Sequence, residues 1–191
     1  MMEGCYARGN KDAKPSVQAY SMVLNACAFA DTYQDEKTGD VVKATLENQL
    51  TAFHVAKMTL DQICKEPYIN VRANPVIYGT FIKCCGRLDL PETLVIDSAK
   101  QAFGDCCNAG YVSDFVLTQL RCALPPEIYL SVLVSNGYSN VDKRGKSISR
   151  DGKRLRHIGI NELPKEWTRN VDSSSSSSSS SSNNNNNKNY R

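Results

Sequence analysis

Two stretches of this chain begin a helix in the same way, with matched positions 58 residues apart. The matched side chains follow the first one at offsets of 3, 6, 7 and 10, which places them on one apolar face of a helix. One helical hairpin cannot bury such a face alone, so the duplication predicts an all-α fold, an α-solenoid of stacked helical hairpins. The matched pairs are Val17 with Pro75, Tyr20 with Tyr78, Val23 with Phe81, Leu24 with Ile82, and Cys27 with Cys85.

Apolar spacing predicts three such hairpins within residues 1–136, which form the repeat region. Tyr20 and Tyr78 are expected to pack in its core. A polar stretch over 31–40 is predicted to be an irregular connector inside the first hairpin. The six helices are predicted over 17–30, 42–64, 76–86, 91–109, 112–123 and 125–135.

Two regions of different composition follow the repeats. Residues 137–171 form a basic extension, in which Asp151-Gly152 is a candidate turn between short strands near Ile148 and Leu155. Residues 172–191 contain an unbroken serine run followed by asparagines. Such a composition buries too little apolar area to offset the entropy lost on ordering, and it predicts a disordered tail.

The residues that would carry catalysis or bind a metal are not arranged in any recognisable motif. The chain has eight cysteines but no C-x-x-C, and only His54 and His157 could complete a zinc site, so we expect no metal and no cofactor. Several cysteines fall on apolar helix positions, which favours buried free thiols. No glycine-rich phosphate loop or cluster of carboxylates is present, and we expect no enzyme. No apolar run is long enough to span a membrane.

The stretches 15–21 and 74–79 resemble the inter-repeat turn of pentatricopeptide repeat proteins, whose helical hairpins stack into a solenoid that binds single-stranded RNA. The rest of the sequence, from residue 79 to residue 169, is similar to the C-terminal portion of algal, particularly diatom, members of that family. The stretches 116–121 and 163–169 are part of this similarity. The resemblance covers about residues 1–171. It implies an RNA-binding protein that acts in organellar RNA processing, stability or translation.

The resemblance also implies which residues contact RNA. Ser21 is in the place of the base reader of the first unit and acts together with Asn74, the residue just before the second unit. This hydroxyl and amide pair is similar to the family's adenine-preferring combination. In the second unit Gly79 stands in the reader's place and has no side-chain donor or acceptor. Val76 matches the apolar residue expected against the base face, whereas Gln18 in the first unit does not.

Charge is distributed unevenly along the chain. Residues 1–140 hold 12 Lys and Arg against 15 Asp and Glu, whereas residues 141–169 hold 9 against 4. Phosphate neutralisation supplies most non-specific nucleic-acid affinity, so the repeats alone are expected to bind weakly. The extension is either a mobile arm that follows the phosphate backbone or a solvated linker. The basic residues of this candidate arm are Lys143, Arg144, Lys146, Arg150, Lys153, Arg154 and Arg156.

The alternative function is a helical-repeat scaffold for protein–protein interaction. Tetratricopeptide repeats, which are also helical hairpins, usually carry a Trp-x-x-Leu-Gly-x-x-Tyr pattern that is absent here. The first repeat begins directly after residues that resemble the end of a preceding helix, so we expect this chain to be the C-terminal part of a longer protein of mitochondria or plastids. If Met1 is the true start, the N-terminal residues do not resemble a signal or transit peptide, and we expect the protein to be cytoplasmic.

Overall fold

The computed structural model describes residues 8–9, 16–65, 71–139 and 158–171, and these residues are mostly helical. The prediction of an all-α fold is therefore confirmed. None of the described helices is long and apolar enough to cross a membrane. The α-helices are α2 (Val17–Ala28), α3 (Leu46–Lys65), α4 (Pro75–Arg87), α5 (Glu92–Ala109), α6 (Asp114–Ala123) and α7 (Pro126–Ser135).

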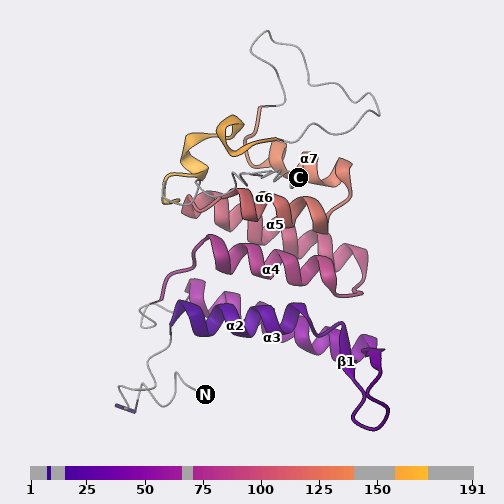
Figure 1. Cartoon of the computed structure of the whole chain (residues 1–191). Coiled ribbons are helices and arrows are strands. Elements are labelled where there is room, and N and C mark those ends of the chain that lie inside the picture. The colour runs from indigo at the N-terminus through magenta and orange to yellow at the C-terminus, as the bar shows by residue number, and fades with distance from the viewer. Residues whose placement is uncertain (1–7, 10–15, 66–70, 140–157, 172–191) are drawn as a thin grey trace, which may run out of the picture.

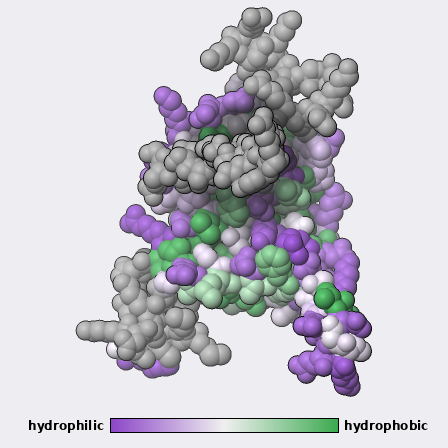
Figure 2. Space-filling view, viewed as in Figure 1, coloured by the Kyte–Doolittle hydropathy of each residue, from purple (hydrophilic) through white to green (hydrophobic). Residues whose placement is uncertain are grey.

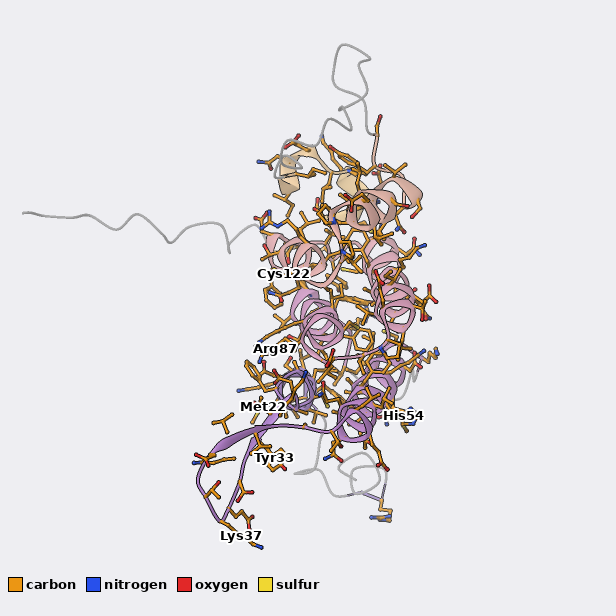
Figure 3. All side chains as sticks on the ribbon, turned by 90° about the vertical axis from the view of Figure 1, so that its right-hand side faces the viewer. Met22, Tyr33, Lys37, His54, Arg87 and Cys122 are labelled. Atoms are coloured by element: carbon orange, nitrogen blue, oxygen red, sulfur yellow. The ribbon has the colours of Figure 1, made fainter. Side chains whose placement is uncertain are left out.

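The helices lie in two columns (Figures 1 and 3). The first column contains α2, α4 and α6, and α4 packs against both of its neighbours there. The second column contains α3, α5 and α7, so each helix of the first column is followed in sequence by one of the second. In Figure 3 the label of Met22 marks the first column and that of His54 the second.

The three helices of the first column begin with the same capping arrangement. Ser16, Asn74 and Ser113 have extended backbones, and the side-chain oxygen of each accepts a hydrogen bond from the backbone N–H three residues later. This bond satisfies one of the backbone donors that a helix start leaves without a partner. The caps are 58 and 39 residues apart, and they define equivalent positions in the three helices.

Most of the apolar face predicted from the duplication lies in the core, but Val23, which was placed on that face, is 41% exposed. Tyr20 and Tyr78 are 5% and 4% exposed, so both pack in the core as expected. The central helix α4 is buried on most of its surface because α2 and α6 cover it from opposite sides. Its contact with α6 is close: a Cβ atom added to Gly86 would lie 2.7 Å from the Cα atom of Ala123. Only glycine allows these two backbones to approach so closely.

The connector predicted as irregular is a β-hairpin, which corrects the prediction for residues 31–40. Strands β1 (Thr32–Gln34) and β2 (Val41–Lys43) pair antiparallel with Tyr33 opposite Val42. Each strand has only three residues and the hairpin is largely exposed on both faces, so the sequence shows no period-two apolar alternation. Helix α3 accordingly begins at Leu46 rather than at residue 42. Figure 3 shows the hairpin projecting beside the first column.

A buried glutamine anchors the base of this hairpin to the helices. The amide nitrogen of Gln49 donates to the carbonyl of Ala44 at 2.9 Å, and its amide oxygen accepts from the backbone N–H of Asp89 at 2.7 Å. Gln49 is 1% exposed, so neither bond can be replaced by bulk water. An ion pair at 2.8 Å between Lys43 and Asp89 adds an exposed contact between the same segments.

Replacing Gln49 by leucine is expected to lower the free energy of unfolding by about 2–3 kcal/mol. The side chain keeps its approximate shape, but the carbonyl of buried Ala44 and the partly buried N–H of Asp89 lose their partners. Urea unfolding followed by circular dichroism measures the change. Asn48→Leu is the control, because Asn48 is the exposed neighbour on the same helix and should change the value by less than about 0.5 kcal/mol. Equal effects of the two substitutions would contradict this assignment.

The described part of the basic extension returns to the second column. Its 3₁₀ helices η2 (Ile160–Glu162) and η3 (Lys165–Trp167) lead to a tryptophan whose ring packs edge-on against Phe103 of α5, with centroids 5.7 Å apart. The backbone N–H of Val112 donates to the carbonyl of Trp167 at 2.8 Å. This part of the extension therefore belongs to the helical core.

Arg169 and Asn170, which follow η3 after Thr168, bind the C-terminal end of α5. Arg169 donates to the carbonyls of Glu166 and Asn108, and the side chain of Asn170 donates to the carbonyl of Ala109 at 2.8 Å. Helix carbonyls at a C-terminus lack partners within the helix, and these side chains supply them. The predicted strands near 148 and 155 and the predicted tail over 172–191 lie outside the described residues.

Candidate nucleic-acid interface

The caps place three sets of equivalent residues along the first column. We call them cap+2, cap+5 and cap+9, counted from Ser16, Asn74 and Ser113. Figure 2 shows that apolar and hydrophilic side chains lie close together on this face of the molecule. The sets are Gln18, Val76 and Phe115 at cap+2; Ser21, Gly79 and Thr118 at cap+5; and Asn25, Lys83 and Cys122 at cap+9.

The two residues predicted to read the first base lie on neighbouring helices. Ser21 is half-buried on α2, and its hydroxyl donates to the carbonyl of Val17 at 2.9 Å. Asn74 caps α4, with its side-chain oxygen accepting from the N–H of Ile77 at 3.0 Å. Both groups thus have a local partner, but the Ser21 oxygen can still accept a hydrogen bond. The amide nitrogen of Asn74 makes no hydrogen bond within the described residues.

The second cap+5 position is closed. A Cβ atom on Gly79 would lie 2.3 Å from the ring of Phe115, a distance at which atoms overlap. The ring therefore lies directly over the backbone of Gly79, which is buried. Gly79 was predicted to offer no side chain to a base, and the structure adds that another residue fills the space above it.

The cap+2 residues carry the exposed apolar surface of the column. Val76 is 48% exposed and Phe115 is 40% exposed, so both offer apolar atoms to a ligand. Gln18 is exposed and polar at the equivalent position of α2. The contact of Val76 with a base stays a prediction.

An aromatic and cationic cluster lies where α2 and α4 end. The ammonium of Lys83 and the guanidinium of Arg87 each lie 4.3 Å from the ring centroid of Phe29. Arg87 also donates to the carbonyl of Ala28 at 2.9 Å and forms an ion pair with Asp31 at 3.0 Å. Its charge is therefore largely compensated within the chain, whereas Lys83 has a neutral hydrogen-bond partner in the side chain of Asn25, at 3.3 Å.

The seven basic residues predicted to form an arm all lie outside the described residues, and the structure assigns them no position. These are Lys143, Arg144, Lys146, Arg150, Lys153, Arg154 and Arg156.

The prediction of buried free thiols is confirmed for five of the described cysteines. Burial raises the pKa of Cys84 and of Cys107 to about 12, and it raises the pKa values of Cys85 and Cys106 further. Cys27 is also buried and free. These side chains stay protonated at neutral pH and act as small apolar residues.

Two residues of this surface were missed by the sequence reasoning. Thr118 occupies the third cap+5 position, half-buried on α6, with a hydroxyl that the second unit lacks. Ser113 caps the same helix and corresponds to Asn74. Their signal was present in the sequence, because a serine followed by Asp114 and an apolar run is a typical helix start.

The chain was compared with known families, proteins and structures. No family model, no curated protein and no solved structure matches this chain.

Proposed function

We propose that this chain is a short α-solenoid that binds single-stranded RNA in the manner of pentatricopeptide repeats, and that it acts in organellar RNA processing, stability or translation. The observation that supports this most is the common register of the first column. Three stacked helices begin with the same cap, so their cap+2 and cap+5 residues recur in order along one surface. A surface with a repeating unit suits a polymer with a repeating unit.

The chemistry of the first unit suits adenine. Adenine offers an amino donor and a ring-nitrogen acceptor on its pairing edge. The Ser21 hydroxyl oxygen can accept from the amino group, and the amide nitrogen of Asn74 can donate to the ring nitrogen. Val76, exposed two residues after Asn74, supplies an apolar contact for the face of the base. Unstacked bases in single strands expose both the edge and the face that such contacts need.

The charge distribution supports a division of roles within this proposal. Residues 1–140 carry three more acidic than basic residues, so the repeats contribute base contacts and little phosphate attraction. The basic extension supplies the attraction to phosphate, which weakens as salt concentration rises.

The proposal is tested with the full chain and fluorescently labelled single-stranded homopolymers of adenine, uracil and cytosine, beside the matching DNA. Wild-type protein is expected to bind RNA and to prefer the adenine polymer by about tenfold, the size that one or two net hydrogen bonds provide. The double variant Ser21→Ala/Asn74→Ser should lose this preference and keep its fold, because serine also caps helices well.

Thr51→Ala is the matched control. Thr51 makes the same local bond as Ser21, from its hydroxyl to the carbonyl four residues earlier, but it lies on α3 in the second column. This variant should keep the adenine preference. Binding without base preference, unchanged in the double variant, would leave only electrostatic attraction. No binding to any RNA would overturn the proposal.

One observation favours the alternative, a scaffold for protein partners. Met22 on α2 is 66% exposed, and a shallow, open depression of about 470 Å³ on α3 is lined by Leu46, Leu50 and His54 among others. Exposed apolar surface of this kind often marks a protein contact. This function gains support if the chain binds no RNA in the experiment above.

A further inference from the structure

The two junctions of the first column differ in one contact. At each junction, the cap+2 residue of one helix and the cap+5 residue of the preceding helix belong to the same unit of the surface. At the first junction these residues are Val76 and Ser21, and at the second they are Phe115 and Gly79. Val76 is 48% exposed, and Ser21 is half-buried. The phenyl ring of Phe115 covers Gly79, with its Cε1 atom 2.3 Å from the position of an added Cβ.

Size explains the difference between the junctions. A valine side chain ends at its γ carbons and cannot extend over the neighbouring helix as a phenylalanine ring does. The ring reaches the backbone of Gly79 because that residue has no side chain to exclude it. Glycine and phenylalanine are therefore a complementary pair, in which the ring occupies the volume that a cap+5 side chain would need.

We propose that Phe115 makes the second unit indifferent to base identity, so that the RNA ligand carries a selected adenine next to an unselected nucleotide. This inference rests on the proposed function, because it takes Ser21 as the reader of the first unit. The absence of a side chain at Gly79 is only part of the reason why the second unit does not select a base. The ring also screens any polar group placed at that position from the strand.

The chain itself supplies the substitutions that test this. Gly79→Ser with Ser113→Asn copies the reader pair of the first unit into the second, and asparagine preserves the helix cap. Adding Phe115→Val also copies the valine of the first junction. The double and triple variants then differ only in the presence of the phenyl ring. The triple variant also has no ring for the new serine to overlap.

Binding is measured by fluorescence anisotropy with the full chain and uracil-rich RNA oligonucleotides that contain one adenine or two adjacent adenines, with an all-uracil oligonucleotide as the reference. Wild-type protein and the double variant are expected to bind both RNAs equally within about twofold. The triple variant is expected to bind the RNA with two adenines about five- to tenfold more tightly, as one added hydrogen bond provides. Circular dichroism verifies the fold of each variant.

The outcomes separate this inference from the function on which it rests. If the double variant already prefers two adenines as strongly as the triple variant, the ring does not screen the position and the inference is wrong. It is also wrong if the triple variant gains no preference while wild-type protein still selects the first adenine through Ser21. Wild-type protein that does not prefer one adenine over none would overturn the proposed function, and this inference with it.

Discussion

The free energy of unfolding is expected to fall by about 1 kcal/mol for each of four buried thiols between pH 8 and pH 10. The ordinary pKa of a cysteine is 9.0, and in the folded chain burial raises the pKa of Cys84 and Cys107 to about 12. Cys85 and Cys106 shift in the same direction for the same reason. Above pH 9 the unfolded chain releases these protons, whereas the folded chain holds them.

The sign of this effect follows from the direction of the shifts. The unfolded state binds fewer protons above pH 9, so stability falls as pH rises. The contribution of the buried thiols to the free energy of unfolding is fully present below pH 9. It is lost progressively as pH approaches about 12, the folded-state pKa of Cys84 and Cys107. The four thiols together are expected to remove roughly 4 kcal/mol by pH 10, a large fraction of the stability of an ordinary domain.

Urea unfolding in the presence of a reductant, at intervals between pH 7 and pH 10, measures this loss. The double variant Cys84→Ala/Cys107→Ala should lose less stability than wild type over the same interval, because two of the groups with raised pKa no longer titrate. Thr51→Ala is the control, since Thr51 is exposed on α3 and carries no group that titrates between pH 7 and pH 10. If the free energy of unfolding of the double variant falls with pH as steeply as that of the wild type, Cys84 and Cys107 do not cause the loss of stability.

Replacing Trp167 by alanine is expected to lower the free energy of unfolding by about 3–5 kcal/mol, the usual cost of removing a large buried aromatic side chain. Trp167 is 5% exposed and packs edge-on against Phe103, which is fully buried. The truncation leaves a cavity over α5, and the contacts of Arg169 and Asn170 with the end of that helix depend on the position of the same segment.

Urea unfolding followed by circular dichroism at 222 nm suits this variant, because helix content is read without the tryptophan. Lys165→Ala is the matched control: Lys165 lies in the same 3₁₀ helix with an exposed side chain, and its loss should change stability by less than about 0.5 kcal/mol. A loss below 1 kcal/mol for Trp167→Ala would mean that the segment contributes little to the fold.

The sequence was sufficient to predict the helices and insufficient to predict the contacts between distant segments. Amphipathic spacing is a local signal, and the structure places α2 and α4 within two residues of the predicted helices. The β-hairpin was missed because its short strands are exposed on both faces and leave no pattern. Tertiary contacts, not local propensity, hold it in place through Gln49.

The same limit applied to the candidate interface. The missing side chain of Gly79 is evident from the sequence, but the ring that covers it belongs to a residue 36 positions later. The packing of Trp167 on Phe103 joins residues 64 positions apart across a segment of basic composition. No periodicity connects such pairs, so only the packed structure could assign them.

The position of the single tryptophan gives this chain a built-in optical probe. Trp167 is the only indole in the sequence, and it lies outside both helix columns, in the segment that docks on α5. Its fluorescence therefore reports the docking of that segment, while far-ultraviolet circular dichroism reports the helices. Unfolding curves that coincide by the two signals would show one cooperative unit, and curves that separate would show that the segment detaches before the helices melt.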